Sequence, residues 1–458
     1  MIKSSQSAGL SPARAVAADV LVRVWGAGAF ASSALDAELR RLDLDPRDAA
    51  LATELVYGVL RAEGYLDDRL AALSRQGYAK DPRVRAHLLM AAYTLAFLDR
   101  IPLFAAVSEA VAGVRAAGDE RVAGFANAVL RRLGSELEGK RPALPDAIVA
   151  SAPGWLRGAL RRSIGRAGAT AYLAAGPVPP PIGLCLGAGE DRATWIDTLQ
   201  KAAPGATIEA GKVSPRAIVV RAAGDVRRLP GAGEAWIVQE EGAQVVALAA
   251  EAKPGERVLD ACAGHGNKTW LLAQEVGPTG AVDAADLYPQ KLEQLRAAAP
   301  GRLVGATYAV DWTAGVGEVP DGYDRVIVDA PCSGVGTLRR RPEIARNRDE
   351  ADLARLAALQ VAITRRAATR VREGGRLVFA VCSVLREECE DVVAALLEGE
   401  ELGVRLEAAP FESEVARGIA AESNMLRVLP HVQGTDGYFV ASFVVRRAAG
   451  SAPVAKLS

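Results

Sequence analysis

The chain has 458 residues, of which 50% are hydrophobic and 24% are charged. This length suits two or three domains, and the composition excludes a largely disordered protein. Its 55 Lys and Arg side chains are balanced by 55 Asp and Glu side chains. The protein as a whole therefore does not attract polyanions, and any nucleic-acid site must be a local patch.

Membrane, secretory and metal-centred proteins are also disfavoured. The sequence has no run of 18 apolar residues free of charge and no signal-peptide core near its start. Its five cysteines do not form a disulfide framework, and its three histidines lie far apart. We expect a soluble, cytoplasmic protein without a bound metal, and a monomer, because nothing in the sequence requires a partner chain.

The N-terminal third predicts a helical domain, which we assign to residues 1–140. Apolar side chains recur at helical spacing over residues 10–134, and the connections are short and polar. Over residues 141–170 five arginines accompany one acid, Asp146. This stretch is a candidate RNA-binding surface, although an ordinary solvated helix face explains it equally well.

The proline-rich stretch 176–181 predicts a stiff boundary. Short strands around one helix come after it, so we expect a basic linker plus a small α/β (RRM-like) subdomain over residues 141–235, packed on the C-terminal domain. Residues 236–450 alternate strands with helices, including a long helix near 349–373, and predict a doubly wound parallel sheet. Residues 451–458 are expected to form a tail.

A ligand of such a sheet is expected beyond the carboxyl ends of its strands. The first strand of this region ends at Asp260 and leads into a glycine-containing turn that opens a helix. Three further acids end the following strands, namely Asp286, Asp311 and Asp329. An acid about 20 residues after such a turn suits ribose hydroxyls. Both NAD and S-adenosylmethionine carry a ribose, but only the methyl donor lacks the pyrophosphate that the full glycine fingerprint serves.

Two cysteines point to a particular chemistry. Cys332 follows the strand that ends at Asp329, and Cys382 follows the next strand. We expect these strands to be neighbours, which brings both thiols to the cofactor edge. Carbon 5 of cytosine is a poor nucleophile, but a thiolate that adds to carbon 6 makes the ring enamine-like and allows methylation. A nearby acid such as Asp329 assists this addition at N3.

The chain resembles the RsmB/Sun (Fmu) family of ribosomal-RNA cytosine-C5 methyltransferases over nearly its whole length. The matching stretches are WIVQEEGAQVVA, DACAGHGNKT, DAPCSGVGTLRRRPEI, CSVLREE and LPHVQGTDGYFVA. The N-terminal region resembles a NusB-like RNA-binding domain through RDAALATELVYGVLR and FANAVLRRLG.

The resemblance implies an enzyme that methylates a cytosine of small-subunit (16S) rRNA, of the cytosine-967 type, on naked RNA or an early assembly intermediate. It implies that Cys382 is the nucleophile, that Cys332 assists release of the covalent intermediate, and that Asp329 contacts the base and the methyl-donor site. It also implies that S-adenosylmethionine is held by Asp286 at the ribose, by Asp311 near the adenine, and by the loop Cys262, Ala263, Gly264, His265, Gly266, Asn267 and Lys268.

Three positions depart from the family pattern. His265 replaces a proline and Asn267 a glycine in the cofactor loop, and Val381 replaces a threonine before the nucleophile. Asn tolerates positive φ, so we expect the turn to survive. We interpret His265 as a loop substitution rather than as a base or ligand, and Cys389, where the family often has Asn, as a bystander.

RNA contacts are expected from the arginines that come after the Cys332 motif, namely Arg339, Arg340, Arg341, Arg346 and Arg348. Trp312 either stacks on a base or packs in the core. Two other functions stay open: methylation of another rRNA or tRNA cytosine, and a non-catalytic RNA-binding assembly factor whose altered loop no longer binds the cofactor. Two thiols argue against protein methylation, which needs no covalent nucleophile.

Overall fold

The computed structural model describes residues 10–74, 81–118, 120–298 and 304–447. The expected tail at 451–458 lies outside these residues. The chain divides into two compact units, one of residues 1–179 and 338–348, the other of residues 180–337 and 349–458. It passes from the first to the second inside the proline-rich stretch 176–181.

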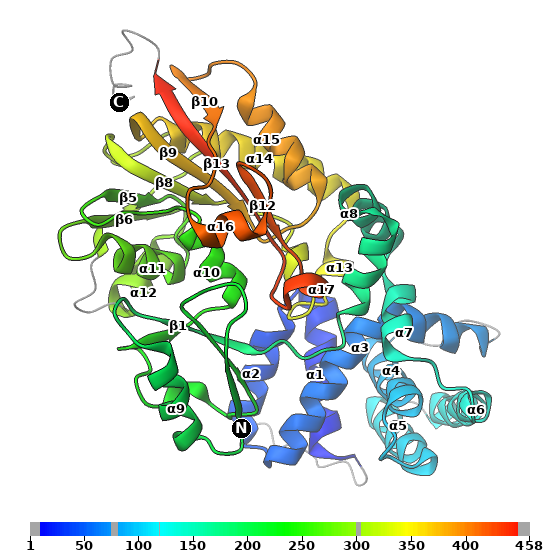
Figure 1. Ribbon diagram of the computed structural model, residues 1–458. Coiled ribbons are helices and arrows are strands. Elements are labelled where there is room, and N and C mark those ends of the chain that lie inside the picture. The colour runs from blue at the N-terminus through cyan, green and yellow to red at the C-terminus, as the bar shows by residue number, and fades with distance from the viewer. Residues whose placement is uncertain (1–9, 75–80, 119, 299–303, 448–458) are drawn as a thin grey trace. The chain divides into compact units, whose positions relative to one another are not determined.

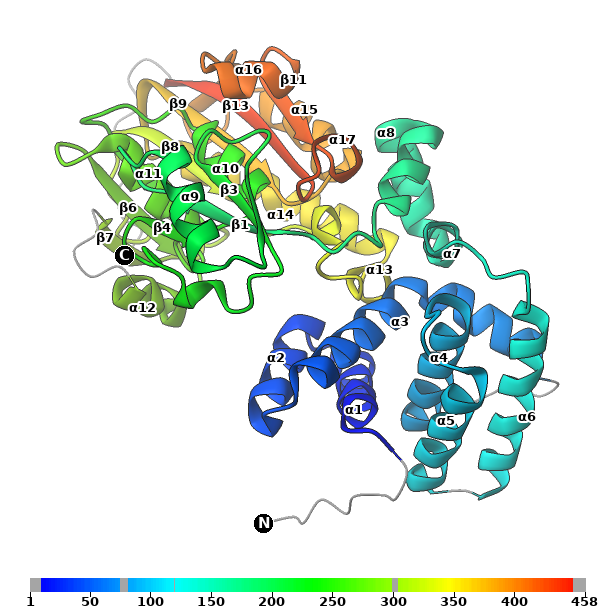
Figure 2. The same cartoon turned by 60° about the horizontal axis from the view of Figure 1, so that its bottom comes forward.

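The first unit is helical, as the apolar spacing predicts. Its helices are α1 (Pro12–Ala27), α2 (Ala31–Leu42), α3 (Pro46–Ala72), α4 (Pro82–Phe97), α5 (Leu103–Ala117), α6 (Glu120–Leu137), α7 (Leu144–Ser151), α8 (Gly154–Ala174) and α13 (Ile344–Asn347). The first six share one apolar core, and Figure 2 shows α4, α5 and α6 side by side. Prolines begin several of these helices, where the missing N–H costs no hydrogen bond.

The basic stretch groups with this helical unit rather than with the small subdomain, because α7 packs on α3 and α8 packs on α7.

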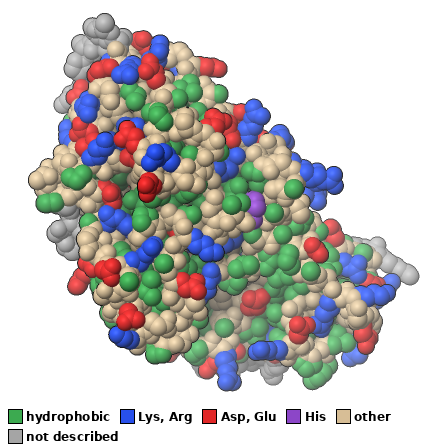
Figure 3. All heavy atoms as spheres, viewed as in Figure 1, with side chains coloured by type: hydrophobic (Ala, Val, Ile, Leu, Met, Phe, Trp, Pro, Cys, Tyr) green, Lys and Arg blue, Asp and Glu red, His purple; other side chains and the backbone are tan. Residues whose placement is uncertain are grey.

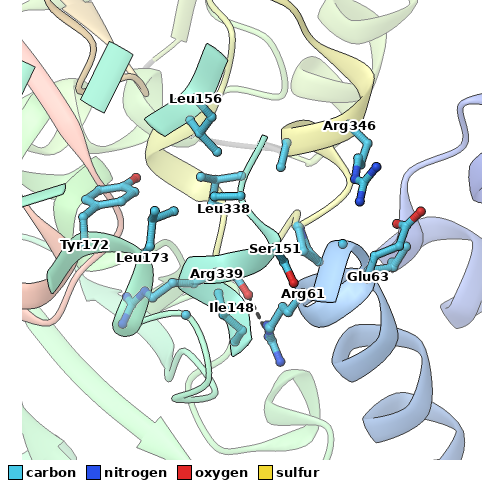
Figure 4. A pocket seen from close by; sticks show the side chains of 16 residues that line it. Arg61, Glu63, Ile148, Ser151, Leu156, Tyr172, Leu173, Leu338, Arg339 and Arg346 are labelled. Atoms are coloured by element: carbon cyan, nitrogen blue, oxygen red, sulfur yellow. Dashed lines mark hydrogen bonds between the residues drawn. The ribbon is translucent and has the colours of Figure 1, made fainter. Parts of the chain in front are cut away.

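A segment from the second half of the sequence, residues 338–348, also packs in the helical unit. The Arg61 guanidinium donates to the Arg339 carbonyl at 2.8 Å (Figure 4), and Glu343 accepts the N–H of Ala31 at 3.1 Å. The Trp155 indole donates to the Ala345 carbonyl at 3.3 Å. Residues of this segment, among them Leu338 and Pro342, also line a cavity of about 50 Å³ together with residues of α3, α7 and α8.

The small subdomain is a four-stranded antiparallel sheet in the order β2-β3-β1-β4. Its elements are β1 (Ile182–Leu186), α9 (Arg192–Ala202), β2 (Thr207–Ala210), β3 (Ala217–Arg221), η1 (Val226–Arg228) and β4 (Trp236–Val238). It packs on the C-terminal domain as predicted: Cys185 shares a buried cluster with Trp270, and Gln244 donates to the Leu184 carbonyl.

The large domain contains a mixed sheet in the order β11-β12-β13-β9-β8-β5-β6-β7, with β10 paired to β13 (Figure 1). Its strands are β5 (Arg257–Asp260), β6 (Ala281–Asp286), β7 (Val304–Ala309), β8 (Tyr323–Asp329), β9 (Val371–Val381), β10 (Val404–Ala408), β11 (Ala420–Glu422), β12 (Met425–Val428) and β13 (Tyr438–Arg447). Its helices are α10 (Glu241–Leu248), α11 (Asn267–Val276), α12 (Pro289–Ala298), η2 (Val335–Thr337), α14 (Glu350–Ala368), η3 (Arg386–Glu388), α15 (Glu390–Leu397), α16 (Glu414–Ile419) and α17 (Pro430–Gln433).

The prediction of a doubly wound parallel sheet is correct for β5 to β9 and wrong for the C-terminal strands. The pairs among β5 to β9 are parallel, whereas β13 joins β9 antiparallel. The chain enters β13 from β12 through a short connection, which suffices for antiparallel neighbours, so the βα rhythm is absent there. The long helix expected near 349–373 ends at Ala368, and β9 begins at Val371.

Both faces of this sheet are covered by helices. On β9, Leu377, Phe379 and Val381 lie in the core shared with α14 and α15. Val378 and Ala380 lie in the core shared with α10 and α11. The order of the parallel strands reverses between β5 and β8, and this topology predicts a ligand-binding crevice beyond the carboxyl ends of these two strands.

Candidate active site

The carboxyl ends of β5, β6 and β8 carry three of the predicted acids. Asp260 and Asp286 are buried, with 1% and 7% of their surface exposed, and Asp329 lies on the next strand beyond Asp260. Asp311 lies two residues past the end of β7 and is exposed. Its carboxylate accepts from the N–H and hydroxyl of Thr313, which lowers the pKa of Asp311.

The loop after β5 is shaped by two glycines with positive φ, Gly264 at 56° and Gly266 at 84°. The Gly264 N–H donates to Asp286 at 2.9 Å, so the loop is fastened to the end of β6. A Cβ on Gly266 would lie 2.6 Å from Leu295. Asn267 begins α11 and does not take a positive φ, so the turn is present as expected, but its positive-φ positions are the two glycines rather than Asn267.

Lys268 and Asp329 form an ion pair across this loop. Burial alone would lower the pKa of Lys268, but the Asp329 carboxylate outweighs it and raises that pKa. The ion pair holds the positive charge of Lys268 beside Asp329, the acid at the end of β8.

Cys332 and Cys382 meet as the strand order predicts. Asp329 pairs with Ala380 in the parallel register of β8 and β9, and the Ala330 N–H donates to the Ala380 carbonyl at 2.9 Å. The two Sγ atoms lie 3.3 Å apart, and both cysteines are half-buried. The contact with Cys382, followed by burial, raises the pKa of the Cys332 thiol well above its usual value.

The residues of the crevice fit S-adenosylmethionine. Asp286 Oδ1 and Oδ2 each accept one backbone N–H, from Tyr288 and Gly264, and a carboxylate has further lone pairs for ribose hydroxyls. Asp260 accepts from the Thr269 hydroxyl through Oδ2, but its buried Oδ1 has no hydrogen-bond partner. A buried acceptor without a partner at this edge suits the ammonium group of the cofactor's methionine.

Burial raises the pKa of Asp260 to about 6, above the 3.8 of an unperturbed Asp. The protonated Asp260 carboxyl therefore contributes fully to the free energy of unfolding below pH 3.8, and this contribution is lost as the pH rises through about 6.

We expect the variant Asp260→Asn to gain stability relative to the wild type as the pH rises from about 5 to 7.5, by about 1 kcal/mol. The measurement is the midpoint of thermal unfolding without cofactor across that range. Asp311→Asn is the matched control and should show no such gain. An Asp260→Asn difference that does not change with pH contradicts the assignment.

The remaining predicted residues lie at the edge of the crevice or in the core. Asn267 and the exposed His265 border a cavity of about 360 Å³ that β4 and α12 also line. Trp312 is 4% exposed and donates to the Ala261 carbonyl at 2.7 Å, which makes it a core residue. Cys389 is fully buried, its pKa raised by burial. Cys262 is half-buried at the start of the cofactor loop.

The arginines proposed for RNA binding are not equivalent. Arg341 and Arg346 are exposed, Arg340 and Arg348 are half-buried, and Arg339 is only 5% exposed. Arg339 is therefore a packing residue of the helical unit rather than a surface available to RNA. All five arginines between 141 and 170 are exposed. On the face shown in Figure 3, basic and acidic side chains are interspersed.

Sequence reasoning missed the groups that hold the two cysteine loops together, above all Glu388. The carboxylate of this residue accepts from the hydroxyls of Ser333 and Ser383, which directly follow the two cysteines. The sequence signal that could have revealed this link is the Cys-Ser pair, which occurs at both cysteines.

Comparisons with known proteins show the family of this chain. The family model "16S rRNA methyltransferase RsmB/F" matches residues 246–444, and the NusB family model matches residues 11–135. The probable ribosomal RNA small subunit methyltransferase B of Bacillus subtilis is 31% identical over 94% of this chain and 98% of its own. The ribosomal RNA small subunit methyltransferase B of Pseudomonas syringae is 33% identical over 94% and 96%.

Among solved structures, PH0851 matches with a TM-score of 0.76 at 20% identity, over 95% of this chain and 99% of its own. NSun6 from Pyrococcus horikoshii matches with a TM-score of 0.53 at 18% identity, over 65% and 98%. At these identities the likeness shows the fold alone.

The fold, the strand-end acids and the sequence relatives together define an S-adenosylmethionine-dependent RNA cytosine-C5 methyltransferase. The chain belongs to the 16S rRNA methyltransferase RsmB/F family and carries an N-terminal NusB-family region.

Proposed function

We propose that this enzyme methylates carbon 5 of one cytosine in small-subunit rRNA, at a site of the cytosine-967 type, through a covalent adduct with Cys382. The observation that carries the proposal is the pair of thiols 3.3 Å apart beyond two neighbouring strands. A methyltransferase that acts on an amine or a hydroxyl has no use for either thiol.

The chemistry assigns different roles to the two cysteines. The Cys382 thiolate adds to carbon 6 of cytosine, and carbon 5 becomes nucleophilic. After methylation, a general base takes the proton from carbon 5, the carbon 5–carbon 6 double bond re-forms, and the bond between carbon 6 and Cys382 breaks with its electron pair on the Cys382 sulfur. Cys332, whose raised pKa keeps it a thiol at neutral pH, assists this release. Asp329 contacts the base, and Lys268 holds its carboxylate in place.

S-adenosylmethionine, when bound, supplies the electrophilic methyl group. The residues proposed to hold it are Asp286 at the ribose, Asp311 near the adenine and the loop from Cys262 to Lys268. Asp260 offers the remaining unpaired acceptor. Because three acids and the loop backbone share this task, it does not require the exposed side chain of His265.

The target base must leave its stack before a thiolate can reach carbon 6, so a loop or an open rRNA segment is the expected substrate. The exposed arginines of 141–170, with Arg341 and Arg346, are the proposed phosphate contacts. We place the enzyme in the cytoplasm as a monomer that binds naked rRNA or an early assembly intermediate. No helix in the described part of the chain is long and apolar enough to cross a membrane.

The test is transfer of labelled methyl to protein-free, unmodified small-subunit rRNA, with tRNA and assembled small subunits in parallel. We expect 5-methylcytosine at a single position of the naked rRNA. Labelling of tRNA alone would replace the proposed substrate. Absence of any transfer, with absence of cofactor binding in a calorimetric titration, would favour a non-catalytic RNA-binding protein.

A further inference from the structure

The two cysteine loops are built alike. Each cysteine is followed by a serine whose hydroxyl oxygen accepts the N–H two residues further on. These bonds run from Val335 to Ser333 and from Leu385 to Ser383, both at 3.3 Å. Both serines are buried, with 2% and 0% of their surface exposed. Each thiol therefore projects from a turn whose shape its neighbouring serine fixes.

One carboxylate joins these two turns. Glu388 Oε2 accepts the hydroxyls of Ser333 at 2.5 Å and of Ser383 at 2.6 Å. Its Oε1 accepts the backbone N–H of Ser333 at 2.7 Å and the amide of Gln360 at 3.1 Å. The Gln360 amide also donates to the Pro331 carbonyl at 3.0 Å, which ties the start of the Cys332 loop to helix α14.

A carboxylate at the position of Glu388 carries a desolvation penalty. Its side chain is fully buried, and the four donors that reach it are uncharged. Taking a carboxylate out of water costs several kcal/mol unless hydrogen bonds satisfy its oxygens. An apolar side chain would fill the space at lower cost, but it could not join two separate loops. The bonding pattern thus points to a role in geometry rather than in stability.

We propose that Glu388 is a positioning residue that sets the distance between Cys332 and Cys382 through Ser333 and Ser383. The catalytic consequence of this inference rests on the proposed function of the two thiols. Nucleophilic attack and release require each thiol within a fraction of an ångström of its place, so loss of this carboxylate affects turnover more than binding. The cofactor contacts at Asp286 and Lys268 do not involve Glu388.

The first experiment measures the thiol geometry without substrate. Dithionitrobenzoate reacts with one thiol, giving a mixed disulfide and one thionitrobenzoate. The second thiol then attacks that disulfide, which forms the Cys332–Cys382 bond and releases a second thionitrobenzoate. In Glu388→Gln we expect this second step to slow at least about tenfold, because the effective concentration of the second thiol falls. Peptide mass mapping identifies the bond, and Cys332→Ala must lack the second step.

Glu390→Gln is the matched control. Glu390 lies two residues further on and pairs with Arg427 at 2.6 Å, so the same substitution there removes a partly buried ion pair without touching either cysteine loop. It should keep the wild-type rate of the second step. An equal rate in Glu388→Gln, with the disulfide mapped to the same pair, overturns the proposal.

Ser333→Ala and Ser383→Ala keep the inference testable if Glu388→Gln does not fold. Each removes the hydroxyl bond to Glu388 together with the turn bond that the same oxygen accepts, and leaves the carboxylate its other donors. We expect each to slow the second step severalfold. If both rates equal that of the wild type, Glu388 does not act through the serines and the proposal fails.

The second experiment separates positioning from folding. In Glu388→Gln we expect kcat for RNA methylation to fall at least about tenfold, while the dissociation constant of S-adenosylmethionine changes less than about twofold. A normal kcat with a slowed thiol step means that the distance is set but is not needed for catalysis, which overturns the catalytic part. If the wild type methylates no RNA while Glu388→Gln still slows the coupling of the two thiols, the proposed function fails and the positioning role stands.

Discussion

The Cys382→Ala variant is expected to lose methyl transfer by at least about a thousandfold, because carbon 5 of cytosine is not activated without the thiolate at carbon 6. The loss should lie in kcat. Binding of S-adenosylmethionine should persist, since Asp286 and the glycine loop are held by bonds that do not involve Cys382. The measurement is single-turnover transfer of labelled methyl, with cofactor binding followed by calorimetry.

Cys185→Ala is the control for removal of a thiol as such. Cys185 is fully buried in β1 and packs against Trp270. It lies in the small sheet and outside the cysteine loops, so its variant should keep transfer within a few-fold of the wild type. Retention of more than about a tenth of the activity in Cys382→Ala would remove Cys382 from the role of nucleophile.

The Cys332→Ala variant is expected to behave differently from Cys382→Ala. It retains the thiol that attacks carbon 6 but lacks the neighbour 3.3 Å away that assists release. We therefore expect a protein–RNA complex that survives denaturing electrophoresis and carries the transferred methyl group. Its amount should approach one RNA per enzyme, whereas steady-state turnover should fall by at least about a hundredfold.

The double variant Cys332→Ala with Cys382→Ala must show no stable complex, since the attacking thiol is gone. A stable complex that forms in Cys382→Ala and is absent in Cys332→Ala would exchange the two roles. Normal turnover in Cys332→Ala, without a complex, would leave that thiol as a packing residue beside the nucleophile.

Local sequence patterns gave the organisation of the chain because each depends on near neighbours. Periodicity and turn residues were enough to predict the helices over residues 10–134, the boundary at the proline-rich stretch 176–181 and the strands from β5 to β9. The prediction that Cys332 and Cys382 lie together needed only one further step, namely that consecutive strands of such a sheet are usually neighbours.

Other features required contacts between residues far apart in the sequence. The arginines after the Cys332 motif were expected at an RNA surface, but residues 338–348 pack in the helical unit and bury Arg339. The pattern of charges is the same for a surface and for a packed segment, so sequence could not separate them. For a similar reason the sequence did not show that β13 joins the sheet antiparallel. The direction of a strand pair depends on the path of the chain between the two strands.

Residue type and spacing were enough to predict the fold class, the strand-end acids and the two thiols. The contacts of the folded chain were needed to show that Glu388 joins the two cysteine loops and that Asp260 has an unpaired buried oxygen. Hydrogen bonding and burial depend on which groups from distant segments meet in space. From sequence alone, a glutamate in a helical turn is predicted to lie at the surface, because its burial depends on loops from distant parts of the chain.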